Sequence, residues 1–227
     1  MISHTHKCIF IHIPKTAGSS INSFFHPGVK FHFKNADYDR LFGWCPKRQL
    51  HMQHATAKQL LETELISEDI WNNYYKFTFV RNPWDRAYSD YLWMMKFANI
   101  KDSFKNYMKQ TGQFDAILND NTKDSFLGDH VLGQHEFFDL DGPLEVDFLG
   151  RFENFSNDIK VVLDALEIQE DFNKNLNKSK RGYSHYSKFY SNSNRDLVGK
   201  KYNKDITLFN YEFQDKRTGF YKLKTLM

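Results

Sequence analysis

The chain has 227 residues, the length of one ordinary domain. Hydrophobic residues make up 41% and charged residues 26%, which excludes a disordered or fibrous chain. The formal net charge of +3 is too small for a general nucleic-acid-binding protein, so any basic patch must be local.

Cysteine content and hydropathy predict the compartment. The only two cysteines, Cys8 and Cys45, have neither the density of a disulfide scaffold nor a CxxC spacing, which favours a reducing environment. The longest apolar run, Cys8 to Ile13, is far shorter than the roughly 20 residues of a membrane helix. A strand predicted this early leaves no room for a signal peptide. We therefore expect a cytoplasmic protein with no integral membrane segment.

The first half of the chain predicts the pattern strand, loop, helix twice. The strand at 8–13 precedes a small-residue loop and a helix at 20–25, and the strand at 75–80 precedes a long helix to about Phe97. Asn82 is expected to cap that long helix and Pro83 to occupy its first turn. Between the two units, helix formers at 55–65 predict another helix, with Thr56 as a possible cap.

The second half is less regular. Residues 102–133 indicate helices with polar connections, and Asp141-Gly142, between 136–140 and 145–152, suggests a hairpin or antiparallel edge. Helices are expected at 154–166 and 194–209. Because strands alternate with helices, we predict one α/β domain over 1–227, with a P-loop-like parallel sheet flanked by helices.

The loop IPKTAGSS, Ile13 to Ser20, has the composition of a phosphate site. Lys15 supplies a positive charge, Gly18 permits close backbone approach, and Thr16, Ser19 and Ser20 offer hydroxyl groups. The start of a helix also favours an anion. The loop is not the ordinary P-loop, because its lysine precedes the glycine. The alternative interpretation is a plain strand-to-helix turn.

A second anion site is predicted where the strand at 75–80 ends. Arg81 follows that strand, and neighbouring parallel strands would place it near the first loop. Ser89, about two helical turns later, could donate to the same anion. The alternative is that Arg81 only pairs with Asp85.

The two motifs together resemble a known family. IPKTAGSS and FVRNPWDRAYSDY (79–91) resemble the 5′-phosphosulfate loop and the 3′-phosphate motif of sulfotransferases that use 3′-phosphoadenosine 5′-phosphosulfate (PAPS). The similarity is to the carbohydrate type, related to heparan 2-O-sulfotransferases. DFLGRFENFSNDI (147–159) and NKSKRGYSHYSKFY…KYNKDITLFNYEF (177–213) extend the resemblance over most of the chain.

The resemblance implies roles for individual residues. The 3′-phosphate would be held by Arg81 and Ser89. Ser179, Lys180 and Arg181 would belong to a mobile loop over the nucleotide, although a solvated basic loop is an equal alternative. The 5′ end would be held by Lys15, Thr16, Ala17, Gly18, Ser19 and Ser20.

Sulfuryl transfer needs a base for the acceptor hydroxyl and a positive charge on the departing phosphate oxygen. In HMQHATAKQL, His54 resembles the family's catalytic histidine, with His51 in reserve, and Lys15 would stabilise the leaving oxygen. A zinc site of Cys45, His51 and His54 lacks a fourth ligand at a familiar spacing, so no metal is expected. Glu153, within the segment GRFEN, resembles a position near the active-site cleft of the family.

Other residues and functions are less determined. Trp84, Trp93, Phe97 and Phe137 could flank an acceptor or adenine, or lie in the core. We expect a hydroxyl acceptor, which the resemblance implies is a carbohydrate, and a bacterial or viral cytoplasmic enzyme. Two alternatives are a nucleotide phosphotransferase, which magnesium dependence would reveal, and a non-catalytic module that binds a nucleotide or an anionic glycan.

Overall fold

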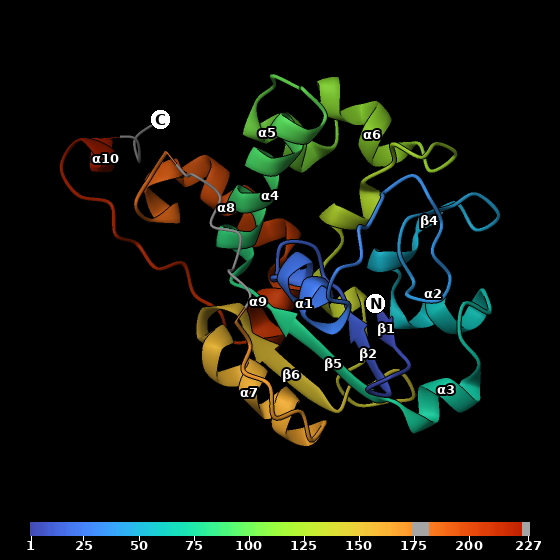
Figure 1. Ribbon diagram of the computed structural model, residues 1–227. Coiled ribbons are helices and arrows are strands. Elements are labelled where there is room, and N and C mark those ends of the chain that lie inside the picture. The colour runs from blue at the N-terminus through green and yellow to red at the C-terminus, as the bar shows by residue number, and fades with distance from the viewer. Residues whose placement is uncertain (174–181, 224–227) are drawn as a thin grey trace.

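A sheet in the order β1-β2-β5-β6 lies at the centre of the computed structural model, which describes residues 1–173 and 182–223 (Figure 1). The strands β2 (Cys8–Ile11), β5 (Tyr75–Val80) and β6 (Phe148–Arg151) run parallel, and β1 (Ile2–Ser3) adds an antiparallel edge. The carboxyl ends of the three parallel strands therefore meet at one edge of the sheet. The predicted α/β fold with a mostly parallel sheet is confirmed.

Side chains that alternate along the strands separate two faces of the core. Ile9 and Ile11 pack on one face with residues of α2 (Ala57–Glu62) and α3 (Glu68–Asn73). Phe10 packs on the other face with α1 (Gly18–Phe25) and α7 (Phe155–Ala165). In Figure 1, α7 lies along β6. Helices thus cover both faces of the sheet, and the strand ends are left for the loops.

A separate aromatic cluster holds the helical part of the molecule together. It forms around α4 (Pro83–Phe97), which leads away from the carboxyl end of β5 (Figure 1). The predicted helical character of 102–133 is confirmed. The other elements are α5 (Phe104–Lys109), α6 (Asp115–Asn119), α8 (Asn192–Lys201), α9 (Asn203–Leu208), α10 (Phe220–Leu223), β3 (Trp44–Cys45), β4 (Leu50–His51), and 3-10 turns at Met52–His54, Gly112–Phe114, Gly128–Val131, Gln134–Glu136, Phe152–Asn154 and Tyr186–Phe189.

Local capping signals were predicted well. Asn82 caps α4 by accepting from the backbone N–H groups of Trp84 and Asp85, and Pro83 occupies the first turn. Thr56 and Gln59 form a reciprocal capping box at the start of α2. Both caps depend on residues within one turn, which explains why the sequence alone indicated them.

The predicted hairpin across Asp141-Gly142 is wrong. Phe148–Arg151 pairs in parallel with β5, and the short bridge between Asp139 and Glu145 is also parallel. The start of β6 is held by Asp147, whose side chain and backbone N–H bond the backbone of Lys76. This long-range pairing overrides the local turn signal.

Two predicted helices are shorter than expected. Residues 55–65 form α2 only to Glu62, after a separate 3-10 turn at Met52–His54, and 194–209 is divided at Tyr202 into α8 and α9. At this division the buried Tyr202 hydroxyl donates to the carbonyl of Val131, which anchors this point of the chain to the 3-10 turn at Gly128–Val131. Strands β1, β3 and β4 have two residues each and were not predicted, because so short a segment has no periodicity. None of the helices described here is long and apolar enough to cross a bilayer.

Candidate active site

The two predicted anion motifs meet at the carboxyl edge of the sheet. Since β2 pairs directly with β5, the loop after β2 lies beside Arg81. Nη1 of Arg81 donates to the backbone carbonyl of Lys15 over 2.8 Å. The structure therefore brings the motifs into direct contact, as the sequence predicted for neighbouring strands.

The loop between β2 and α1 has an unusual backbone. Lys15 and Ala17 have left-handed φ angles of 71° and 77°, which non-glycine residues seldom adopt outside constrained sites. The buried Thr16 hydroxyl donates to the carbonyl of Ile13 over 2.7 Å, and this hydrogen bond stabilises the turn of the loop. Ser19 is exposed, Ser20 is buried, and Lys15 and Ala17 are half-buried.

The N-terminus of α1 suits an anion. Ala17 occupies the cap position without any side-chain hydrogen bond, and the first turn holds no acidic residue. The helix dipole and the first-turn N–H groups favour negative charge at such a terminus. An anionic group of the donor fits this end of the loop by chemistry.

Gly18 has a different neighbour from the one the sequence suggested. A Cβ atom at this position would lie 1.8 Å from Nε2 of His12, and its φ is not left-handed. The missing side chain makes room for the His12 imidazole. We had expected it to make room for a phosphate, and the structure assigns the close approach to His12.

Arg81 is buried and already paired. Its Nε and Nη2 both donate to Oδ2 of Asp85, over 2.9 and 2.7 Å, and the guanidinium lies 4.1 Å from the Phe152 ring centroid. The ion pair between Arg81 and Asp85, which the sequence offered as the alternative, is therefore present. Asp85 orients the guanidinium, and it would also compete with a phosphate for it. Ser89 is buried on α4.

His54 lies within a stack of aromatic rings. Its ring centroid is 4.6 Å from that of His12 and 4.9 Å from that of His130. His130 stacks in turn on Trp93 at 4.7 Å, and Nζ of Lys15 lies 5.0 Å from the Trp93 ring centroid. The predicted base and the predicted lysine thus converge on one ring stack.

Burial disfavours the charged forms of His54 and His51. It lowers the pKa of His54 well below its usual value, with His12, His130 and His51 adding repulsion. Burial also lowers the pKa of His51 to about 4. A neutral imidazole is the form that can accept a proton, and His54 has that form at neutral pH.

His51 occupies a different environment from His54. Its ring makes edge contacts with Trp44 and Phe33, at centroid distances of 5.1 and 6.3 Å. It is not among the rings stacked between His12 and Trp93. Of the two histidines, His54 is the one in contact with the ring stack that Lys15 also contacts, which favours His54 over His51 as the candidate base.

Several residues that the sequence analysis did not single out hold His130, one of the rings of the stack, in place. Nδ1 of His130 lies 2.7 Å from Oδ1 of Asp90, and the Tyr107 hydroxyl donates to Oδ2 of Asp90 over 2.9 Å. Arg86 donates to the carbonyls of Pro14, His130 and Leu132, which ties the first loop to the His130 segment. No local motif marks these residues, because their partners are far apart in sequence.

One group of side chains resembles a metal site in composition. Ligand atoms of His54, Asp129 and His130 lie within 4.8 Å of one another. The two imidazole rings, however, stack at an interplanar angle of 21°, and Nδ1 of His130 already faces Oδ1 of Asp90 at 2.7 Å. Cys45 of the earlier zinc alternative instead contacts the Tyr38 hydroxyl and Nη1 of Arg48.

The remaining candidates divide between site and core. Glu153 accepts from the backbone N–H of Asn82 and from the Tyr211 hydroxyl, so it supports the turn after Arg81. Trp84 and Phe137 are buried in the core, whereas Phe97 is 50% exposed. Ser179, Lys180 and Arg181 lie outside the described residues.

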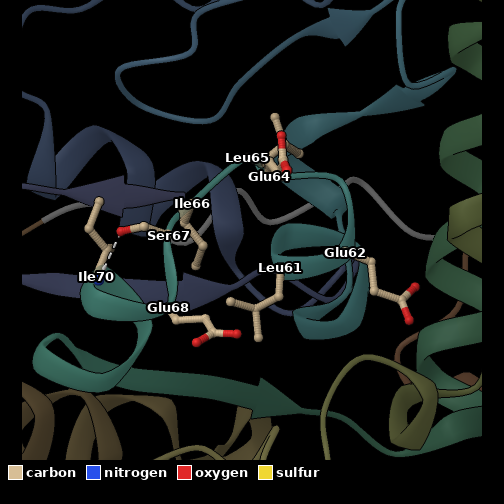
Figure 2. Close-up of a pocket in the computed structure, with 8 residues that line it drawn as sticks. All are labelled: Leu61, Glu62, Glu64, Leu65, Ile66, Ser67, Glu68 and Ile70. Atoms are coloured by element: carbon tan, nitrogen blue, oxygen red, sulfur yellow. Dashed lines mark hydrogen bonds between the residues drawn. The ribbon is translucent and has the colours of Figure 1, made fainter.

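Two clefts lie away from the ring stack. Figure 2 shows the first, of about 700 Å³, where Glu62, Glu64 and Glu68 make the region of α2 and α3 unfavourable for an anionic nucleotide. The second, of about 670 Å³, adjoins the Arg81 motif. Its lining residues are Asn82, Asp85, Arg151, Glu153, Ser184, His185, Tyr186, Asn210, Tyr211, Glu212 and Gln214.

Comparison with known proteins identifies the family of this chain. The model of the sulfotransferase family matches residues 1–212. An uncharacterized protein of Archaeoglobus fulgidus is 26% identical over 113 residues, which cover 49% of this chain and 83% of that protein. No solved structure matches the chain. The family match spans nearly the whole chain, and this chain belongs to the sulfotransferase family.

Proposed function

We propose that this enzyme transfers the sulfuryl group of PAPS to a carbohydrate hydroxyl, with His54 as the base. Family membership implies an enzyme that uses PAPS as sulfuryl donor. The observation that carries the finer proposal is the convergence of Lys15 and His54 on the Trp93–His130 stack, next to the contact between Lys15 and Arg81.

The donor site is proposed at the two strand ends. The loop from Lys15 to Ser20 would hold the 5′-phosphosulfate, because the α1 terminus, the lysine and the exposed Ser19 all favour an anion. Arg81 and Ser89 would hold the 3′-phosphate. The proposal for Arg81 is supported by its hydrogen bond to the Lys15 carbonyl, since two anion sites in contact are close enough for one nucleotide to bridge.

The chemistry proposed for the site is a direct displacement. His54 accepts the proton of the acceptor hydroxyl as the acceptor oxygen bonds to sulfur. The bond from sulfur to the phosphate oxygen breaks, and its electron pair leaves with 3′-phosphoadenosine 5′-phosphate (PAP). Lys15 stabilises the charge that develops on that oxygen.

Exposed aromatic rings support a sugar acceptor. Phe97 stacks on Trp93 at a centroid distance of 4.6 Å, and Phe33 lies 5.7 Å from Phe97. Phe33 and Phe97 are 37% and 50% exposed, so their faces can pack against the C–H faces of a sugar ring. A reducing, cytoplasmic compartment is also part of the proposal, since Cys8 and Cys45 are both free thiols.

The decisive experiment is a transfer assay with labelled PAPS and a panel of sugar acceptors, run with and without EDTA. We expect transfer that does not need magnesium. Thermal shifts with PAP, ATP and NAD test the donor, and PAP should stabilise the protein selectively.

A histidine variant tests the base. His54→Ala should abolish turnover and keep the PAP thermal shift, because His54 is assigned no donor contact. Replacement of the exposed His32 by alanine is the matched control and should change neither property. Full activity of His54→Ala would remove His54 from the mechanism.

A further inference from the structure

A buried carboxylate faces the proposed base. Nδ1 of His54 lies 3.4 Å from Oδ2 of Asp129, and the two side chains are 6% and 14% exposed. Within the part of the chain that the structure describes, neither atom has a hydrogen-bond partner. The distance is slightly longer than an ordinary N–H···O hydrogen bond, as is common for catalytic groups before substrate binds.

The hydrogen bond that Asp129 makes to the backbone does not require Oδ2 to face His54. Its other oxygen, Oδ1, accepts from the backbone N–H of His130 over 3.1 Å. Oδ2 is left facing the imidazole, although a buried polar atom without a hydrogen-bond partner destabilises the folded state. A position that retains such a cost is a candidate for function.

The ring of His54 has little freedom to tilt. His12 packs against it at an interplanar angle of 43°, and His130 stacks on it at 21°. Asp90 in turn holds His130. The two ring nitrogens of His54 therefore differ in the groups that they face. Nδ1 faces Asp129.

Positive charge on His54 needs compensation. Burial and the charges of His12, His130, His51 and the N-terminal amine all oppose a positive charge on His54, and Lys15 adds a cation beyond Trp93. Asp90 is engaged by His130 and Tyr107. Burial raises the pKa of Asp129 to about 6, so this carboxyl can be ionised at neutral pH. Asp129 is thus the anion placed directly at the base.

We propose that Asp129 is a positioning residue for His54, and this inference rests on the proposed function. Asp129 accepts a hydrogen bond from Nδ1–H, so Nε2 presents its lone pair to the acceptor hydroxyl. When Nε2 takes that proton, the carboxylate offsets the charge of the imidazolium. The proton then passes to solvent after the sulfated product leaves.

The test compares Asp129→Asn with Asp124→Asn. Asp124 is a matched control because it lies on the same segment and pairs with Lys34 at the surface. In Asp129→Asn we expect kcat to fall by about 10²-fold or more, with the KM for PAPS and the PAP thermal shift unchanged. Asp124→Asn should behave as the wild type. Unchanged kcat in Asp129→Asn would overturn the inference.

The pH profile separates positioning from a structural role. Loss of a neighbouring anion lowers the pKa of His54, so the acidic limb of kcat/KM against pH should move to lower pH in Asp129→Asn. A purely structural role would lower the amplitude and leave that limb in place, which would refute the proposal.

A third measurement needs neither activity nor a variant. Nitrogen NMR of the wild-type protein should show neutral His54 with its proton on Nδ1, and a proton on Nε2 would overturn the inference. If the wild type transfers nothing from PAPS while this tautomer is found, the proposed function fails and the His54–Asp129 pairing stands.

Discussion

Replacement of Gly18 by alanine tests the packing at the loop between β2 and α1 most directly. The added Cβ would lie 1.8, 2.1 and 2.2 Å from Nε2, Cε1 and Cδ2 of His12. The imidazole cannot easily retreat, because Phe10 packs on it at 5.3 Å and His54 at 4.6 Å. The backbone itself would accept alanine, since the φ of Gly18 is not left-handed.

The size of the effect follows from two opposing contributions. Overpacking of a filled site costs about 1 to 3 kcal/mol. Alanine is the better helix former by up to about 1 kcal/mol. We therefore expect a net loss of roughly 1 to 2 kcal/mol, or about 2 to 8 °C in Tm for a domain of this length. Turnover should also fall, because a displaced His12 pushes against His54.

A double-variant cycle by thermal unfolding checks this reasoning. In a His12→Ala background the clash is absent, so Gly18→Ala should be neutral or slightly stabilising. The change of sign is the diagnostic result. Equal destabilisation by Gly18→Ala with and without His12 would refute the proposed contact.

Three further predictions concern the donor, the pH and the acceptor. Arg81→Ala should weaken PAP binding strongly when the affinity is measured by calorimetry. The control is Arg40→Ala, which removes a comparable but more exposed ion pair with Asp37 and should leave PAP binding unchanged. Equal PAP affinities of the two variants would contradict the role of Arg81. The folded pKa of His51, about 4, lies below its unfolded value, so the unfolded chain binds the proton first and stability falls as pH drops from about 6.5 to 4. Asp129, with its raised pKa, opposes this trend between about 4 and 6. In urea titrations between pH 6.5 and 4, the free energy of unfolding of His51→Gln should fall by up to about 3 kcal/mol less than that of the wild type. An unaltered pH dependence of the free energy of unfolding would refute the lowered pKa of His51. Phe97→Ala should raise the KM for a sugar acceptor and leave the KM for PAPS unchanged, with the exposed Val161→Ala as control; an unchanged acceptor KM would exclude the ring from binding.

Local signals in the sequence were sufficient for the elements that carry the donor motifs. The strand before Arg81, the cap at Asn82 and the proline in the first turn of α4 each depend on neighbours within a few residues. The strand–loop–helix order then implied parallel strands with their loops at one edge. The contact between Arg81 and Lys15 is the consequence.

Long-range pairing decided what local signals could not. The turn dipeptide at Asp141-Gly142 predicted a hairpin, yet Asp147 bonds to Lys76 and aligns β6 in parallel. The division between α8 and α9 falls at Tyr202, whose buried hydroxyl donates to the distant carbonyl of Val131. In each case the deciding partner is distant in sequence, so no window of neighbouring residues contains it.

The sequence by itself predicted the fold class and the two anion motifs, because each depends on residue types at short spacings, and its resemblance to the sulfotransferases singled out His54 as the candidate base. Only the tertiary structure decided the surroundings of that histidine. His12, Asp129 and His130 come from separate segments, and folding alone brings their rings and carboxylate together. Burial then sets their charge states, since the cost of desolvating an ion depends on the whole packed environment and not on the neighbouring residues in the chain.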